Sequence, residues 1–404
     1  MAEEIAQSAP IRPITRGPGF HWFGYYDKDQ FDPAGRFVLG MRVDFEHRSP
    51  TADDHVRVGM VDLEAGDEWT ELGTSNAWCW QQGCMLQWRP GSDSEIVWND
   101  RLEGRLVCHV LDVETHNQRT LGRPIYTISP DGQTALGIDF FRTGRLRPGY
   151  GYAGDDPYRG DLAPEDSGIY RLDLETGHFE PIVSIAEIAA IPQAHFPAED
   201  RQHYVNHVLW SPDGSRFIFL HRSVAADGSG EGRRRTRMFT ADPDGGNLRI
   251  IDDHGGMSHF IWRDPGHILG WANRPPHGGS FYLFDERGEA EPQPVGPGAM
   301  ATDGHCTYLP GGRWIVNDSY PHTAEQRNQQ LYLYHPGEDR RIDLAALPSP
   351  PEYTGEWRCD LHPRSSRDGR FLCVDSPHGG DGRQMYVIDV GEVVGRPGSG
   401  ERNA

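Results

Sequence analysis

The sequence predicts an all-β fold, a seven-bladed β-propeller with about four antiparallel strands in each blade. Two repeated patterns indicate it. The first is a short apolar run that ends in an acidic or turn-forming signature, which we expect to be a strand followed by a hairpin turn. It occurs seven times: Val58–Glu64, Val110–Thr115, Tyr170–Gly177, Phe239–Gly245, Tyr282–Gly288, Leu331–Gly337 and Tyr386–Gly391.

The second pattern is a hairpin turn between two apolar strands, and one copy precedes each copy of the first. Proline at the second turn position and glycine at the fourth are typical of type I turns. Recurrence at a period near fifty residues indicates units arranged in a ring. The Ser-Pro-Asp-Gly form of the turn is typical of TolB-type propellers. The seven copies are Asp32–Leu39, Trp88–Gly91, Ser129–Gly132, Ser211–Phe219, Arg263–Leu269, Leu309–Ile315 and Arg367–Leu372.

These repeats predict one propeller domain over residues 20–391, preceded by an N-terminal extension, 1–19, and followed by a disordered tail, 392–404. We expect the stretch His21 to Asp27 to close the ring as a strand that completes a blade. One helix is predicted, Ser184 to Ala190. The insertion Thr143 to Leu162, which is rich in Gly, Tyr and Asp, is expected to help build the binding face.

The chain of 404 residues carries a formal charge of -21, which disfavours nucleic acid and anionic membranes as partners. An anionic substrate would need a locally basic site. Met1 to Arg12 has no apolar core of a signal peptide and no run suits a transmembrane helix, so we expect a cytoplasmic protein. The six cysteines lack a compact framework spacing, which favours free thiols or a metal ligand. The sequence does not predict an oligomeric state.

A histidine stands seven residues before a turn glycine in four consecutive repeats. The four are His207, His259, His305 and His362, at intervals of 52, 46 and 57 residues. In a propeller they would lie at the same depth of four neighbouring blades and converge on one patch beside the central channel.

Residues two apart on a strand share a face, so Asp360 should point with His362 and Asp303 with His305. Imidazole with a carboxylate or thiolate suits zinc or manganese. The sequence therefore predicts a divalent metal site drawn from the patch and its neighbours. The candidate ligands are His259, His305, His362, Asp360 and Cys359. The alternative is that each histidine hydrogen-bonds a neighbouring blade.

Three further groups are candidates for binding an anionic sugar. Arg222, Arg235 and Arg237 could hold a carboxylate or sulfate, although the neighbouring Arg233 and Arg234 suit a solvated loop. The second group lies in and after a Trp-rich segment, where amides and a guanidinium suit sugar hydroxyls and core packing is the alternative; it consists of Gln81, Gln82, Asn99 and Arg101. The third group consists of tyrosines, which can carry a proton or contact the sugar: Tyr150, Tyr152 and Tyr204.

Four segments resemble a group of seven-bladed propellers that contains the oligogalacturonate lyases and the propeller-type ulvan lyases. They are His21–Lys28, Asn206-His207 with Trp210–Gly214, Gly304–Cys306 and Cys359–Pro363. The resemblance covers residues 20 to 390. It implies cleavage of uronic-acid glycosides by β-elimination, with a metal held by histidines and a glutamine in the first group. His362 matches the last metal histidine and His305 the one a blade earlier. The second histidine falls on Asp360 and the glutamine near Trp357.

The resemblance and the residues together predict a lyase acting on an anionic, uronic-acid-containing oligosaccharide. His207 or His259, or a tyrosine of the 143–162 insertion, would take the C5 proton, while arginine or a metal neutralises the carboxylate. One alternative is a non-catalytic TolB-like module that binds sugar or protein. The other is a glycoside hydrolase, for which Asp303 and Asp360 are the available carboxylate pair.

Overall fold

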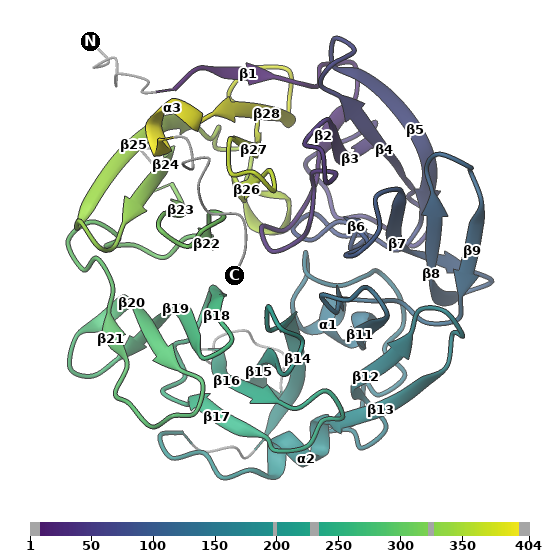
Figure 1. The fold of residues 1–404 in the computed structure, drawn as a ribbon. Helices are drawn as coiled ribbons and strands as arrows, with labels where there is room; N and C mark the ends of the chain where they lie inside the picture. Colours follow the sequence, from purple (N-terminus) through teal and green to yellow (C-terminus); the bar gives the residue numbers. More distant parts are fainter. Residues whose placement is uncertain (1–8, 197–199, 227–233, 322–326, 396–404) are drawn as a thin grey trace.

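A computed structural model describes residues 9–196, 200–226, 234–321 and 327–395. Within them the chain forms seven four-stranded antiparallel sheets arranged in a ring around one axis (Figure 1). The predicted seven-bladed β-propeller is confirmed. No helix of the described residues is both long enough and apolar enough to cross a membrane.

Each blade runs from its innermost to its outermost strand in chain order, except the last. Blade 1 is β2 (Phe20–Trp22), β3 (Phe37–Val43), β4 (Val56–Asp62) and β5 (Glu68–Ser75). Blade 2 is β6 (Gln87–Trp88), β7 (Glu95–Leu102), β8 (Arg105–Asp112) and β9 (Gln118–Leu121). Blade 3 is β10 (Thr127–Ile128), β11 (Thr134–Ile138), β12 (Gly168–Asp173) and β13 (Phe179–Ser184). Blade 4 is β14 (Arg201–Trp210), β15 (Phe217–Ala225), β16 (Arg235–Ala241) and β17 (Arg249–Asp252).

The remaining blades complete the ring. Blade 5 is β18 (Phe260–Asp264), β19 (His267–Arg274), β20 (Gly278–Asp285) and β21 (Gln293–Pro294). Blade 6 is β22 (Thr307–Tyr308), β23 (Ile315–Asp318), β24 (Asn328–His335) and β25 (Arg340–Pro348). Blade 7 is β26 (Arg364–Ser365), β27 (Phe371–Ser376), β28 (Gln384–Asp389) and β1 (Ile11–Pro13). The first sequence repeat marks the third strand of each blade, and in blades 1 to 6 the outermost strand follows it in the chain.

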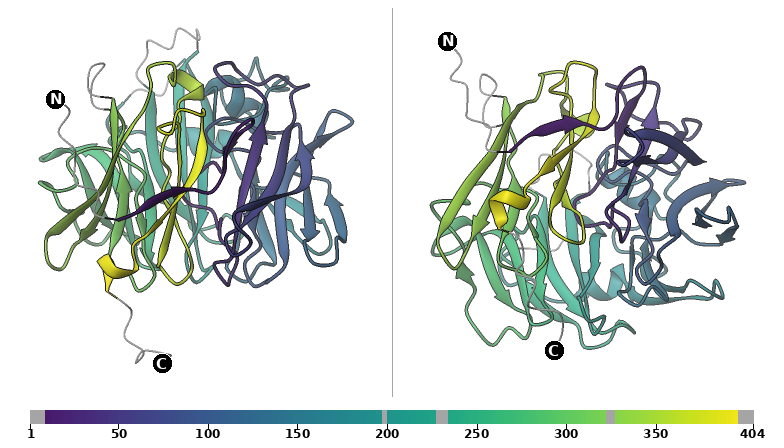
Figure 2. Two further views of the ribbon diagram at one scale, coloured as in Figure 1. Left: turned by 90° about the horizontal axis from the view of Figure 1, so that it is seen from above. Right: turned by 45° about the horizontal axis from the view of Figure 1, so that its top comes forward.

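Ring closure differs from the prediction. The N-terminal strand β1 pairs with β28 and is the outermost strand of blade 7 (Figure 2), whereas the predicted closing stretch contributes β2, the innermost strand of blade 1. The propeller therefore takes in residues that we expected to precede it. Closure of the last blade by the other end of the chain joins the two termini of the ring through backbone hydrogen bonds.

The inner hairpin turns have the chemistry that the sequence indicates. In Ser211–Gly214 the Ser211 hydroxyl donates to Asp213 at 2.7 Å, and the Gly214 N–H donates to the Ser211 carbonyl at 2.9 Å. Gly214 has φ of 70°, which favours glycine there. The same three features recur in Ser129–Gly132 and Ser366–Gly369, so the turn is a repeated unit of the fold.

Helices are few. The predicted helix is present as α2 (Ile185–Ala190), which Ser184 caps by accepting from the Glu187 N–H. Two short elements were not predicted: α1 (Phe140–Leu146) and α3 (Gly391–Val394), with a single 3₁₀ turn η1 (Gly355–Trp357). Because α3 is ordered, the tail does not begin at residue 392 as predicted, and residues 396–404 lie outside the described part.

Tertiary contacts explain why α1 forms in a segment without strong helix propensity. The buried guanidinium of Arg142 donates to the carbonyl of His203 at 2.6 Å and to the carbonyls of Asp161 and Leu162 at 2.9 Å each. These bonds attach the 143–162 insertion to β14. The insertion is therefore held against blade 4, next to the histidine patch.

Candidate active site

Three of the four histidines stand just before an innermost strand, and His207 lies within one. His259, His305 and His362 precede β18, β22 and β26, while His207 lies in β14 at a bulge, with φ of 56°. The ring centroids of His207 and His259 are 6.4 Å apart, those of His259 and His305 4.3 Å, and those of His305 and His362 4.1 Å. The predicted convergence on one patch is confirmed.

Two buried tyrosines that follow β2 of the first blade, Tyr25 and Tyr26, pack against this patch. The Tyr25 ring lies 5.0 Å from both His207 and His362, and the Tyr26 hydroxyl lies 3.2 Å from His207 Nε2. Tyr26 also donates to the Phe260 carbonyl at 2.8 Å. His207 is therefore a packed member of the channel core rather than a group that faces a cavity.

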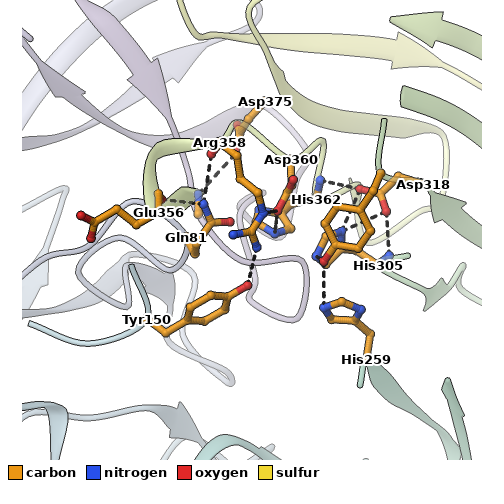
Figure 3. Close-up of polar contacts among 12 residues, drawn as sticks. Gln81, Tyr150, His259, His305, Asp318, Glu356, Arg358, Asp360, His362 and Asp375 are labelled. Atoms are coloured by element: carbon orange, nitrogen blue, oxygen red, sulfur yellow. Dashed lines mark hydrogen bonds and ion pairs between the residues drawn. The ribbon is translucent and has the colours of Figure 1, made fainter. Parts of the chain in front are cut away.

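Asp318, at the end of β23, orients two of the histidines (Figure 3). His305 Nδ1 lies 2.9 Å from both carboxylate oxygens of Asp318, and the His305 and His362 backbone N–H groups donate to the same carboxylate at 2.7 and 3.1 Å. With Nδ1 held by Asp318, Nε2 is the His305 nitrogen that would be available to a metal ion. Burial first, then neighbouring positive charge, holds the pKa of His305 and His362 well below the usual range, so both rings are neutral.

His305, Asp360 and His362 place one ligand atom each within 4.8 Å of one another, and all three are buried. His362 Nε2 is a buried nitrogen without a hydrogen-bond partner in the described residues, and Asp360 Oδ2 lies 3.9 Å from it. An unpartnered neutral imidazole nitrogen beside a carboxylate is what a divalent ion requires. The residues present therefore fit zinc or manganese, with a two-histidine, one-carboxylate ligand set.

Two residues predicted as ligands lie outside this group. His259 instead pairs through Nδ1 with Asp303. Cys359 is buried, and burial first raises the pKa of its thiol beyond the usual range, with Arg383 opposing this. Cys359 is not among the three clustered side chains.

Arg358 links Asp360, one of the three clustered side chains, to Tyr150 of the 143–162 insertion. Its Nε donates to Asp360 at 2.7 Å and its Nη2 to the Tyr150 hydroxyl at 2.5 Å (Figure 3). Burial would raise the pKa of Tyr150, but the guanidinium groups of Arg358 and Arg147 outweigh burial and lower it. Gln81 supports this arrangement because its amide donates to the carbonyls of Glu356 and Arg358 at 2.9 and 3.0 Å.

A pocket of about 500 Å³ opens beside the patch. Four arginines line it, together with His259, Asp303 and Tyr320: Arg147, Arg222, Arg234 and Arg235. Among the described residues, none of the four arginines forms a salt bridge. Burial first, and then Arg147, lower the pKa of Arg222 to about 10, and its buried Nε has no hydrogen-bond partner there. In a chain of charge -21, this pocket is a locally basic surface, which is the kind of surface that an anionic ligand requires.

His259 faces this pocket with a fixed orientation. Its Nδ1 lies 2.8 Å from Asp303, whose other oxygen accepts from Ser258 at 2.7 Å. Its Nε2 lies 3.4 Å from the Tyr320 hydroxyl. A carboxylate that holds Nδ1 leaves Nε2 free to accept a proton, which is the arrangement of a general base.

The remaining predicted sugar contacts have structural partners in the blades. Asn99 bonds to Ile125 and to the Tyr152 hydroxyl, Gln82 donates to the Tyr126 hydroxyl, and Arg101 donates to the Ala153 carbonyl. Tyr152 also stacks on Phe140 at 4.4 Å.

Arg237 likewise belongs to the scaffold, because it donates to the carbonyl groups of Ile188 and Ile191 at the end of α2. Tyr204 differs from these residues. Its buried hydroxyl has no hydrogen-bond partner in the described part of the chain, and it lies opposite Arg222 across the β14–β15 pair.

Sequence reasoning missed Asp318, Tyr320, Arg358 and Arg147. A signal for Asp318 exists, since Asp-Ser follows the turn glycine by six residues both at Asp318 and at Asp375. Asp375 has the corresponding task in blade 7, where it accepts from Phe23 and pairs with Arg364 at 2.9 Å. Arg358 and Arg147 do not belong to a repeated sequence pattern of this kind.

No protein-family model matches the sequence, and no curated protein matches it. The fold has close counterparts among solved structures. Oligogalacturonate lyase from Vibrio parahaemolyticus superposes with a TM-score of 0.66 at 15% identity, covering 96% of each chain. An oligogalacturonate lyase in complex with manganese gives 0.67 at 16%, covering 96% of this chain and 95% of that one. The chain has the fold of the oligogalacturonate lyases.

A xyloglucanase from Xanthomonas campestris also matches, with a TM-score of 0.51 at 14% identity, over 92% of this chain and 52% of that chain. At these identities the similarities establish the fold. The chemistry has to be argued from the site.

Proposed function

We propose that the protein is a lyase that cleaves uronic-acid-containing oligosaccharides by β-elimination. The observation that carries this proposal is the arginine-lined pocket that opens onto His259. Four guanidinium groups line this pocket, and among the described residues none of them has a carboxylate partner. Such a group of arginines suits a uronate carboxylate, which a guanidinium can bind with two parallel hydrogen bonds.

The reaction begins at C5 of the uronate, whose proton is acidified when positive charge neutralises the adjoining carboxylate. Arg222 and Arg235, which line the pocket, would bind that carboxylate. His259 Nε2 accepts the C5 proton, and Asp303 holds the imidazole and stabilises the imidazolium that forms. The C5–H electrons then form the C4=C5 double bond as the bond from C4 to the leaving oxygen breaks. Tyr320, on the pocket wall beside His259, is the candidate that protonates that oxygen.

His305, Asp360 and His362 would hold zinc or manganese next to this pocket. When bound, such an ion supplies a further positive charge that favours the carbanion-like transition state. Asp318, which contacts His305 Nδ1, would leave His305 Nε2 to hold the ion, and Arg358 would orient Asp360 through its hydrogen bond.

Support for His259 over the other predicted bases comes from its position. His207 is enclosed by Tyr25, Tyr26 and Phe260 and does not line the pocket. Tyr152 is buried and stacks on Phe140 of α1, and Tyr204 is buried opposite Arg222 in the β14–β15 pair.

The hydrolase alternative has less support. It needs one carboxyl group that is protonated near neutral pH. Burial would raise the pKa of Asp303, but His259 outweighs it and lowers the pKa, so this group stays ionised. Asp360 pairs with Arg358. A non-catalytic docking module would carry no stoichiometric metal at the histidine patch.

The proposal is tested by following ultraviolet absorbance of the unsaturated product with oligomers of galacturonate, of rhamnose and glucuronate, and of ulvan. An increase that a chelator or His259→Asn abolishes supports elimination and identifies the sugar. His267→Asn is the matched control, because His267 Nδ1 contacts Asp264 at 2.8 Å but its side chain is 42% exposed and lies outside the pocket. A flat trace for every oligomer with metal bound contradicts the proposal.

A further inference from the structure

A second histidine and carboxylate cluster lies at the edge of the arginine-lined pocket. His195, Asp253 and His254 each place a ligand atom within 4.8 Å of the others. His195 belongs to the connection between α2 and β14, a different segment from the 143–162 insertion. Asp253 and His254 directly follow β17. His254 and the neighbouring Phe196 line the pocket itself.

The geometry of this cluster suits a tetrahedral ion. Ligand atoms at about 2.0–2.1 Å from zinc are about 3.3 Å from one another in a tetrahedron. His195 Nε2 lies 3.4 Å from Asp253 Oδ1, close to that edge. The centroids of the His195 and His254 rings are 4.4 Å apart with an interplanar angle of 22°, so the two rings stack face to face.

The tautomer of His254 is set as in a metal site. Its Nδ1 lies 3.1 Å from Asp252 Oδ1, and Asp252 in turn lies 3.6 Å from Arg274 Nη1. A carboxylate that holds Nδ1 leaves Nε2 as the coordinating nitrogen. The same device orients His305 through Asp318 at the histidine patch.

We propose that His195, Asp253 and His254 bind a second divalent transition-metal ion, with zinc as the best fit to two imidazoles and one carboxylate. Three protein ligands leave one tetrahedral position for water. The ion joins the α2–β14 connection to the end of β17. It thereby reinforces the contact between the Ala194 N–H and Asp253 Oδ2, which are 3.4 Å apart.

The ion would also fix one wall of the pocket. Phe196, next to His195, packs against Arg235, whose guanidinium carbon lies 3.9 Å from the ring centroid. It also packs against Gly255, where a Cβ would meet the Phe196 ring at 2.3 Å. Fixing His195 therefore restrains Phe196 and, through it, the position of Arg235.

The test is calorimetric titration of chelator-stripped, full-length protein with zinc. Wild type should bind two equivalents, and His195→Ala should weaken one of them by at least about 100-fold, because a direct ligand matters at least as much as the groups that orient ligands. His195 has a side chain that is 45% exposed, so its loss should leave the fold intact. His267→Ala is the matched control. The His267 side chain is 42% exposed and pairs with Asp264, but among the described residues no third metal-ligating side chain joins this pair.

His362→Ala separates the two sites, because it should remove the other equivalent and leave this one. A second readout is amide exchange of Ala194, which zinc should slow in wild type and not in His254→Ala. The proposal is overturned if His195→Ala binds as much zinc as wild type, or if His267→Ala loses as much as His195→Ala.

Discussion

Replacing Arg222 by methionine should stabilise the protein while removing its capacity to bind an anionic sugar. Arg222 is buried, with 6% of its surface exposed, and its Nε has no partner in the described residues. Its pKa falls to about 10 because of burial and of Arg147. At about 1.4 kcal/mol per tenfold change in proton affinity, this fall from the ordinary arginine value corresponds to about 3 kcal/mol. Methionine keeps the apolar stem, so we expect a net gain of about 1–3 kcal/mol.

Arg237→Met is the matched comparison and should have the opposite sign. Burial lowers the pKa of Arg237 to about 10 as well, but its guanidinium donates to the carbonyls of Ile188 at 2.8 Å and Ile191 at 3.1 Å. Removing it leaves these acceptors at the end of α2 without their partner, at a cost of about 1–3 kcal/mol.

Urea unfolding of both variants, with and without galacturonate oligomer, measures these effects. The oligomer should raise the unfolding midpoint of wild type and of Arg237→Met, and leave that of Arg222→Met unchanged. If Arg222→Met is destabilised by more than about 1 kcal/mol, Arg222 is a structural residue like Arg237 and the anion-site argument fails.

Three further outcomes are expected. Replacing His259 by alanine should lower kcat by about 100- to 10,000-fold with the metal content unchanged, and loss of metal together with activity would assign it a ligand role instead. Asp318→Asn should weaken zinc or manganese binding by about 10- to 100-fold in calorimetry, because it orients His305; unchanged affinity in a folded variant would contradict this.

The last of these outcomes concerns acid stability. Burial first lowers the pKa of His21 to about 4, so the unfolded chain takes up its proton at a higher pH than the folded one. Stability from this group is complete above about pH 6.5 and is lost as pH falls toward 4, by about 3 kcal/mol in all. His21→Gln should flatten that loss in urea unfolding, and an identical pH profile would exclude the effect.

The fold could be predicted because every blade repeats the same local chemistry. The inner turn and the acidic hairpin recur at a period near fifty residues, and in three blades the turn is stabilised locally by a bond from serine to aspartate, as from Ser211 to Asp213. Closure by Ile11–Pro13 could not be predicted in the same way, since a three-residue strand has too little pattern and its pairing with β28 is set by the completed ring.

The residues of the candidate site likewise fall into two groups, those that occupy a repeat position and those that do not. The four histidines occupy one repeat position, so their convergence followed from the period. The arginines near them lie on or next to α1, β15, β16 and η1. These arginines do not share one repeat position, so the period did not predict that they meet. Arg222 and Arg237 look alike in sequence, yet one lines the pocket and the other caps α2. Their difference depends on which face of β15 and β16 each occupies and on what packs there.

The most direct test is the mass of the products formed from a defined galacturonate or glucuronate oligomer. Elimination conserves the mass of the substrate, so the two fragments should sum to the substrate and one should carry the unsaturated ring. Fragments that together are heavier by one water would show hydrolysis, and would contradict both His259 as the base that takes the C5 proton and the arginine-lined pocket as the place of elimination.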